Sequence, residues 1–321
     1  MTFVEWLSES DPSIRWQVMR DLTDEPAEDV AAERARVAHE GWGAQLLALQ
    51  GADGQWGGGT YFPEWTSTTP TLALLRQFGL DPASDEARRA IDLVRANSRW
   101  EHAGQPFFEG EVEPCINGQA VVIGAYFGED VGGIVDRLLT EQMADGGWNC
   151  EQENGSTRGS FNSTICVLEG LLEYERATGG GPRVTAARLR GQEYLLVRRL
   201  FRRLSTGEVV DPAWLRFSFP TGWHYDVLRG LDYLRSAGVV PDQRVADAIA
   251  LVESKRDGDG RWPLENPHHD ELLVDLDEGE GRPSRWNTLR ALRVLRWHEA
   301  GQAGASSGAK SEVARSGSDK A

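Results

Sequence analysis

A short turn recurs three times in this sequence, each time after a stretch with the periodicity of an amphipathic helix. Its copies read Asp53-Gly-Gln-Trp56, Asp145-Gly-Gly-Trp148 and Asp259-Gly-Arg-Trp262. Asp-Gly favours a tight turn because glycine readily adopts a positive φ angle. We expect each tryptophan to pack back onto the helix that has just ended. A self-similar unit of this kind predicts a repeat architecture built from helical hairpins.

Apolar, leucine-rich helical stretches recur between these turns. We place them at 11–22, 67–76, 115–126, 162–172, 224–234 and 286–295. More polar amphipathic stretches alternate with them, near 29–50, 84–97, 131–143, 184–203 and 242–255. The polar set suits an outer layer that faces solvent, and the apolar set suits an inner layer that is covered on both sides. No stretch has the alternation of a strand.

Each hairpin has an apolar face that it cannot bury alone, and an open stack of hairpins would leave the apolar faces at its two ends exposed to solvent. Closing six hairpins into a ring removes those ends. We therefore predict an all-α protein with an (α/α)6 toroid as a single domain over 1–300, in which the inner helices start at one mouth. The segment 301–321 is rich in Gly, Ser and Ala without apolar periodicity, which predicts disorder.

Charge and composition exclude several classes of function. The net charge of −16 disfavours binding to nucleic acid or to anionic membranes. No run of apolar residues predicts a transmembrane segment, and no secretory signal is evident, so we expect a cytoplasmic protein. The three cysteines, Cys115, Cys150 and Cys166, form neither a CxxC pair nor the framework of a disulfide-rich domain. The sequence leaves the oligomeric state open.

The DGxW turns and the six-hairpin pattern resemble the terpenoid cyclase and protein prenyltransferase group, over about residues 10–298. The turns are similar to the repeats of squalene and oxidosqualene cyclases, and related turns occur in prenyltransferase β subunits. The resemblance implies a toroid whose pore binds a hydrophobic, isoprenoid-type ligand. This chain offers one toroid, whereas squalene cyclases have two α domains, so a complete triterpene cyclase is not expected.

The prenyltransferase resemblance implies a zinc cofactor held by an Asp-x-Cys pair and a histidine. Glu113-Pro-Cys115 and His224, each at the start of an inner helix, are the candidates here, and all three residue types bind zinc. Glu113 stands where that family has Asp, and the two inner helices are not adjacent in the predicted ring. The pattern therefore favours a structural role for Cys115 over a zinc site.

The cyclase resemblance implies an Asp-x-Asp-Asp motif whose middle Asp protonates an alkene or epoxide. Asp275-Leu-Asp277-Glu278 is a near match, with Glu in the last place. Such an acid needs a pKa raised by a hydrophobic pocket. Because this segment belongs to an acidic loop, the pattern favours solvated carboxylates, with Asp277 kept as a candidate acid.

Aromatic and polar residues gather near the predicted mouth. Trp223-His224-Tyr225-Asp226 is the densest cluster, and His224 and Asp226 are candidate catalytic residues. Aromatic faces stabilise cations and line apolar pockets, and Arg285 could bind a carboxylate or diphosphate. The candidate ligand-binding residues are Trp65, Phe108, Asn117, Trp214, Trp223, Tyr225, Arg285 and Trp286.

Three functions stay open from the sequence. The first is a cyclase-like or prenyltransferase-like protein that binds a hydrophobic small molecule, with acid-initiated chemistry. The second is a non-catalytic toroid that binds a lipid or a partner. The third is a sugar-active barrel in which Glu113 and Asp226 would flank a glycosidic bond.

Overall fold

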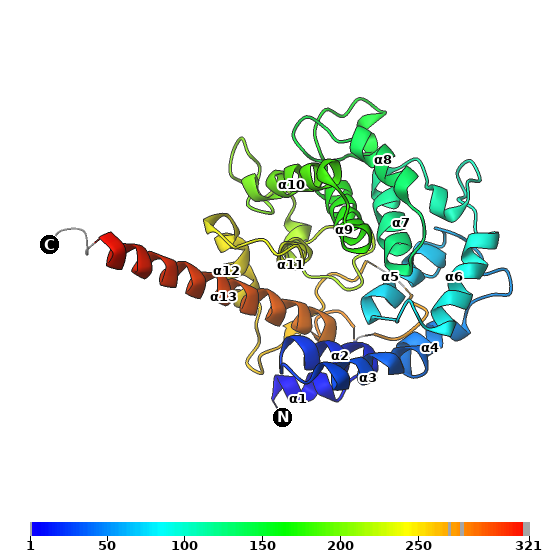
Figure 1. The fold of residues 1–321 in the computed structure, drawn as a ribbon, viewed down its shortest axis with the longest axis horizontal. Helices are drawn as coiled ribbons and strands as arrows, with labels where there is room; N and C mark the ends of the chain where they lie inside the picture. The colour runs from blue at the N-terminus through cyan, green and yellow to red at the C-terminus, as the bar shows by residue number, and fades with distance from the viewer. Residues whose placement is uncertain (1, 269–270, 277–278, 317–321) are drawn as a thin grey trace.

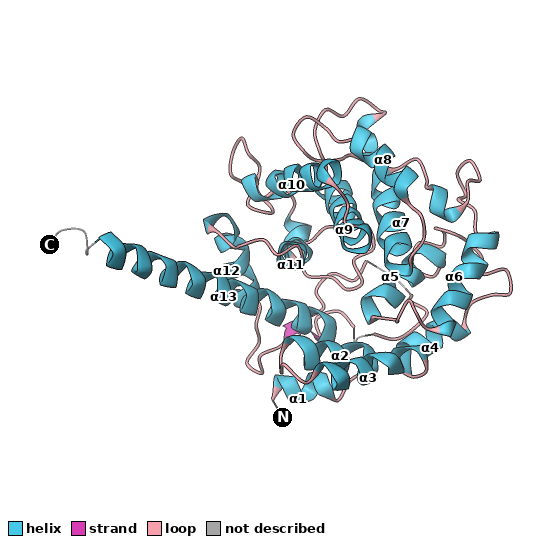
Figure 2. Cartoon of the chain, viewed as in Figure 1, coloured by secondary structure: helices cyan, strands magenta, loops and turns pink. Residues whose placement is uncertain are grey.

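A computed structural model describes residues 2–268, 271–276 and 279–316, with side chains as far as 303. The predicted all-α class is confirmed, because helices dominate the described chain and the two strands are two residues long each (Figure 2). The helices are α1 Phe3–Ser8, α2 Pro12–Asp21, α3 Ala27–Ala35, α4 Gly41–Ala48, α5 Thr68–Phe78, α6 Asp85–Asn97, α7 Pro114–Phe127, α8 Gly132–Thr140, α9 Phe161–Thr178, α10 Pro182–Val197, α11 Val227–Ser236, α12 Ala246–Ser254 and α13 Arg285–Ser316.

The six apolar stretches become α2, α5, α7, α9, α11 and α13, which we call the inner helices, and the polar stretches become the helices between them, which we call the outer helices. Several boundaries differ from the prediction, and two of the differences concern the start or the division of an element. The stretch 29–50 divides into α3, the 3-10 helix Arg36–Ala38 and α4. Helix α11 begins at Val227 instead of 224, because the side chain of Asp226 accepts a hydrogen bond from the Arg229 backbone N–H and so caps the helix.

The three DGxW turns form the same set of contacts. The indole N–H of Trp56, Trp148 and Trp262 donates in each case to a carbonyl ten residues earlier, at Leu46, Leu138 and Val252. All three side chains are fully buried. The prediction that each tryptophan packs back onto the preceding helix is therefore confirmed.

Each tryptophan of a DGxW turn is also tied to the next inner helix. The backbone N–H groups of Trp56, Trp148 and Trp262 donate to the hydroxyls of Thr68, Thr164 and Thr288, at 3.3, 3.0 and 3.0 Å. These threonines lie in the first turns of α5, α9 and α13. One turn thus fastens the end of an outer helix to the start of an inner one, and we call this arrangement the tryptophan lock.

Neighbouring inner helices contact one another along the chain, and the last returns to the first. Helix α2 contacts α5, and the contacts continue through α7, α9 and α11 to α13, which packs against α2. At this last contact, Arg293 donates to the side chain of Gln17 at 2.7 Å, and Arg296 donates to the Asp21 carbonyl at 2.6 Å. The beginning and the end of the helical body therefore lie side by side (Figure 1).

Helices α7 and α9 pack especially closely because each has a glycine that faces the backbone of the other helix. A Cβ atom on Gly118 would lie 2.5 Å from the Cys166 backbone, and one on Gly170 would lie 2.7 Å from the Gly118 carbonyl oxygen. Any larger residue at these positions would push the helices apart. This contact sets the spacing of the two helices whose N-terminal ends border the site described below.

The C-terminal part of α13, which ends at Ser316, projects from the body (Figure 1). Residues 317–321 lie outside the described chain. Within the described residues, no helix combines the length and the apolar character needed to cross a membrane.

Candidate functional site

An open cavity of about 790 Å³ lies at the N-terminal ends of α7 and α9. Aromatic side chains form part of its wall, namely Tyr61, Phe62, Trp100 and Trp223. Five carboxylates border the same space, those of Glu64, Glu101, Glu111, Glu113 and Glu151. None of the described residues that line it is Lys or Arg. The cavity is therefore both apolar and anionic, a combination that suits a ligand with an apolar body and no negative charge.

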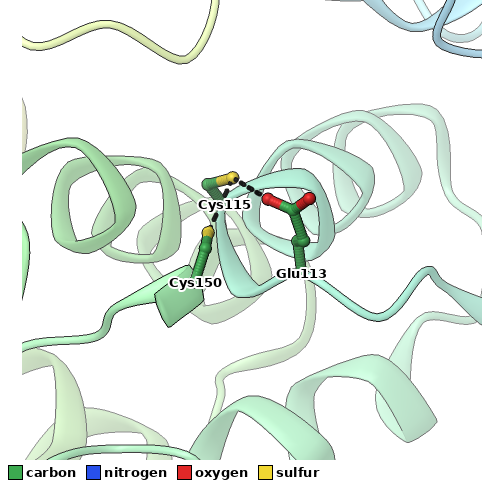
Figure 3. A group of neighbouring side chains, drawn as sticks. All are labelled: Glu113, Cys115 and Cys150. Carbon is green, nitrogen blue, oxygen red and sulfur yellow. Dashed lines mark hydrogen bonds between the residues drawn. The ribbon is translucent and has the colours of Figure 1, made fainter. Parts of the chain in front are cut away.

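Three potential metal ligands converge on one wall of this cavity. One ligand atom each from Glu113, Cys115 and Cys150 lies within 4.8 Å of the others (Figure 3). The two sulfur atoms are 3.0 Å apart, and the Cys115 sulfur is 3.5 Å from a Glu113 carboxylate oxygen. Cys115 is buried, Cys150 is half-buried and Glu113 is exposed.

Glu113 and Cys115 are held in place by a network around the loop that precedes α7. The side chain of Asn117 accepts a hydrogen bond from the Glu111 N–H at 2.7 Å and donates to the Glu111 carbonyl at 2.8 Å. Arg137 donates to the carbonyls of Glu111 and Val112 at 2.6 and 2.7 Å. The Glu111 carboxylate accepts from the Glu113 N–H at 2.7 Å. This loop is therefore fixed before any ligand arrives.

Cys150 reaches the site because it follows the second tryptophan lock by two residues. It opens the 3-10 helix Cys150–Gln152, which the Asn149 side chain caps by accepting from the Glu151 N–H. Its backbone N–H donates to the Ser163 hydroxyl at 3.3 Å, and its sulfur is also 3.3 Å from that hydroxyl. The lock thus places Cys150 against the first turn of α9 and opposite α7.

The two thiols have opposite pKa shifts. The hydrogen bond to Cys150, together with burial, raises the pKa of the Cys115 thiol well above its ordinary value. That same hydrogen bond lowers the pKa of the Cys150 thiol, and the Ser163 hydroxyl adds to this lowering. Of the two thiols, Cys150 is therefore the one that ionises more readily.

The donor set fits a zinc ion by chemistry and number. Thiolate and carboxylate are both common zinc ligands, and three protein ligands with one open position are typical of a catalytic site. Two thiolates on one tetrahedral zinc ion lie about 3.8 Å apart, from a Zn–S bond length of about 2.3 Å. The observed sulfur–sulfur distance is 3.0 Å, so the two sulfur atoms must move slightly apart to bind zinc. The side chain of Cys150 is half-buried and can make this movement.

A second, smaller cavity of about 130 Å³ lies between the inner helices. Residues of α5, α7, α9, α11 and α13 line it, among them Arg76, Arg229 and Glu169. Arg229 forms a two-pronged ion pair with Glu169, at 2.9 and 2.6 Å, and Arg76 pairs with Glu173. Arginine side chains in ion pairs therefore form part of the wall of this cavity.

His224, predicted as a catalytic or zinc-binding residue, is not among the converging ligands. Its ring stacks on His268 at a centroid distance of 3.8 Å and on Trp223 at 3.9 Å. Burial, with His268 and Arg229 nearby, lowers the pKa of His224 from 6.5 to about 3. The imidazole is therefore neutral near pH 7, and Cys150 takes the third ligand position that the sequence analysis gave to His224.

Asp226, the other candidate catalytic residue of this cluster, is 1% exposed and accepts hydrogen bonds from the N–H groups of Arg229 and Ser218. Burial raises the pKa of its carboxyl. It acts as a helix cap, and it does not line the cavity with Glu113. Asp277 lies outside the described residues.

The predicted ligand-binding residues divide between the cavities and the core. Trp223 lines the large cavity and donates to Glu64 at 2.5 Å, whereas Trp65 lines the small one. The remaining candidates make other contacts. The rings of Phe108, Trp214, Tyr225 and Trp286 pack against Phe107, Phe161, Phe161 and Phe219, in that order. Arg285 lies over the ring of Trp6, and Asn117 accepts a hydrogen bond from the Glu111 backbone.

Cys150 is the residue that the sequence analysis missed. The signal available was its position two residues after Trp148, since only the second DGxW turn has a potential metal ligand there; Gly58 and Leu264 occupy the matching places. A comparison with models of known protein families finds no match, and a comparison with curated proteins finds no significant relative.

Proposed function

We propose that this protein binds a zinc ion through Glu113, Cys115 and Cys150 and takes a hydrophobic, isoprenoid-type small molecule into the adjoining cavity. The convergence of these three side chains on the wall of the aromatic cavity carries the proposal. This function is close to that of the protein prenyltransferases, with Cys150 in the place of the family's histidine.

We also propose that the helices form an (α/α)6 toroid. The order of contacts between the inner helices, with α13 returning to α2, supports a closed ring. The small cavity touched by α5, α7, α9, α11 and α13 would then be the centre of the pore, and the large cavity would lie at its mouth.

When bound, zinc would supply a Lewis acid that activates a thiol or water placed at its open position. The protein's own residues supply the rest. Asn117 and Arg137 hold the loop that carries Glu113, and the tryptophan lock at Trp148 holds Cys150. The aromatic wall receives the apolar part of the ligand, because burying apolar surface there is favourable.

The charge around the cavity narrows the class of ligand. An isoprenoid diphosphate, which the prenyltransferase resemblance implies, needs basic residues near its phosphates, and the described lining has carboxylates instead. We therefore propose a neutral or cationic ligand with an isoprenoid-like body. Acid-initiated cyclisation gains no support from His224, since an imidazole that is neutral at pH 7 is a poor acid for an alkene.

A non-catalytic binding protein is the second candidate. The small size of the cavity between the inner helices favours it, because only about 130 Å³ is open where Arg76 and Arg229 form their ion pairs. In that case the large cavity would still bind an apolar ligand, and the zinc ion would stabilise the fold.

Metal analysis of the reduced protein tests the zinc site. We expect one zinc ion per chain after zinc loading and gel filtration, and none in Cys115→Ala or Cys150→Ala. Cys166→Ala is the matched control, since Cys166 is fully buried and is not among the three converging side chains, and it should keep its zinc. A wild-type protein that retains no zinc would overturn the proposal.

Ligand binding needs a separate measurement. Native mass spectrometry of the purified protein should detect a retained apolar molecule, or one added as a neutral isoprenoid alcohol. Trp223→Ala should weaken that binding because it removes part of the aromatic wall. Tighter binding of the corresponding diphosphate than of the alcohol would contradict the proposed ligand class.

A further inference from the structure

Two of the three cysteines lie in contact although they are 35 positions apart in the sequence. Cys115 lies in the first turn of α7, Cys150 lies beyond the Trp148 turn, and their sulfur atoms are 3.0 Å apart as free thiols. A disulfide bond has a sulfur–sulfur distance of about 2.05 Å, so a shift of about 1 Å would join them. Side-chain rotation of Cys150, which is only half-buried, can provide that shift.

The two thiols differ in access. Both thiols line the open cavity, but Cys150 is half-buried whereas Cys115 is only 6% exposed. A small oxidant that enters the cavity therefore meets Cys150 first, with Cys115 within reach as the second thiol. The Ser163 hydroxyl, 3.3 Å from the Cys150 sulfur, can donate a hydrogen bond that stabilises the thiolate.

The third cysteine has neither feature. Cys166 is fully buried within α9, where its sulfur contacts the Trp223 carbonyl at 3.6 Å and the Arg229 guanidinium at 3.7 Å. It provides an internal control for a reaction that requires both access and a partner thiol.

We propose that Cys115 and Cys150 form a peroxide-sensitive dithiol that closes into a disulfide and thereby withdraws both sulfur ligands from the metal. The disulfide itself follows from the contact and access of the two thiols. The release of metal rests on the zinc site of the proposed function.

The reaction balances with hydrogen peroxide as the oxidant. The Cys150 thiolate attacks the O–O bond, so that one oxygen becomes the sulfenic acid of Cys150 and the other leaves as hydroxide, which takes a proton to become water. The Cys115 sulfur then attacks the Cys150 sulfur. The sulfenic hydroxyl leaves with the Cys115 proton as a second water molecule, and two thiols and one peroxide become one disulfide and two waters.

The test uses the full chain in reduced form, both metal-free and zinc-loaded, treated with a small excess of hydrogen peroxide. Titration with a thiol reagent in denaturant should show the three free thiols fall to one. Peptide mapping without reductant should join the peptides of Cys115 and Cys150, and dithiothreitol should reverse the link. In the zinc-loaded protein, a chromogenic chelator should detect zinc release at the same rate as the thiols are lost.

Two variants make the result specific. Cys166→Ala should oxidise like the wild type, whereas Cys150→Ser should keep both of its thiols under the same treatment. Metal-free protein that keeps three thiols, or that links Cys166 instead, would overturn the inference. Zinc that stays bound after the disulfide has formed would overturn the coupling to the metal.

The two proposals fail separately. Protein that forms the Cys115–Cys150 disulfide but never binds zinc supports the dithiol and contradicts the zinc site. Protein that binds zinc through these residues but resists peroxide even when metal-free contradicts the dithiol alone.

Discussion

The inner helices of this protein start in two different ways. Helices α5, α9 and α13 follow a tryptophan lock, and all three use the same pair of hydrogen bonds. Helices α2, α7 and α11 have no DGxW turn before them, and their starts differ from one another. Helix α7 carries Glu113 and Cys115, whereas α11 follows a stack of Trp223, His224 and His268.

The locked starts hold the helices together, whereas an unlocked start carries most of the candidate metal site. The locked starts repeat because each satisfies the same local need, which is to bury an indole and to pair the backbone between two helices. The unlocked starts are free of that requirement and can carry reactive side chains. Cys150 connects the two kinds of start. It follows the locked turn at Trp148, and its sulfur contacts the sulfur of Cys115 at the unlocked start of α7.

The largest effect should come from breaking a lock. Trp148→Ala should lower the free energy of unfolding by about 3–5 kcal/mol, because it removes a large buried side chain and leaves a cavity. Trp56→Ala and Trp262→Ala should cost similar amounts in guanidinium unfolding. Trp223→Ala, in the partly open cavity wall, should cost clearly less. A loss below about 1 kcal/mol for one of the three lock tryptophans would show that the locks are not equivalent.

The unlocked start of α11 should respond to acid. The folded-state pKa of His224 is lowered to about 3, so between pH 6.5 and 3 the unfolded chain binds a proton that the folded chain does not. Stability is therefore present above pH 6.5 and falls as the pH drops. Solvent screening of the half-buried ring leaves an expected loss of about 1–2 kcal/mol between pH 7 and pH 4.

The variant His224→Phe keeps an aromatic ring in the stack and cannot titrate. Its unfolding free energy should therefore change less with pH over this range than that of the wild type, measured by urea unfolding at each pH. The exposed His39 serves as the control through His39→Phe, which should leave the wild-type pH dependence in place. Identical pH profiles for His224→Phe and the wild type would contradict the assignment.

The unlocked start of α7 should depend on Asn117 for its metal affinity. Asn117→Ala releases the Glu111 backbone that positions Glu113, so zinc binding should weaken by about tenfold, which is about 1.4 kcal/mol. A competition titration with a chelator measures this, with unfolding followed in parallel. The exposed Asn97 provides the matched control, and Asn97→Ala should bind zinc like the wild type. Unchanged affinity in Asn117→Ala would remove it as a positioning residue.

The smallest effect concerns the second hydrogen bond of each lock. Thr164→Val keeps the shape of the side chain but leaves the buried Trp148 N–H without its acceptor, which should cost about 1 kcal/mol. Thr68→Val and Thr288→Val should behave alike if the three locks are equivalent. Thr178→Val, at an exposed position near the end of α9, should stay within about 0.5 kcal/mol of the wild type in the same unfolding assay.

The helical elements and the packing of each DGxW tryptophan onto the preceding helix could be predicted from the sequence because their causes are local. Amphipathic periodicity marks a helix within its own length, and Asp-Gly before a tryptophan marks a turn within four residues. The sequence pattern starts α11 three residues too early because the capping role of Asp226 depends on its orientation toward Arg229. Nothing local in the sequence distinguishes an aromatic residue in a cavity wall from one in a core, and Phe108, Tyr225 and Trp286 are all buried.

The sequence by itself determined an all-helical chain with a repeated tryptophan turn, and it identified Glu113 and Cys115 as a pair at the start of one helix. Only the tertiary structure decided that their partner is Cys150 and that His224 stacks on His268 instead. The physical reason is distance along the chain. Cys115 and Cys150 meet because α7 and α9 pack through Gly118 and Gly170 while the Trp148 lock turns the chain back toward them. A short stretch of sequence therefore cannot show that Cys115 and Cys150 lie in contact.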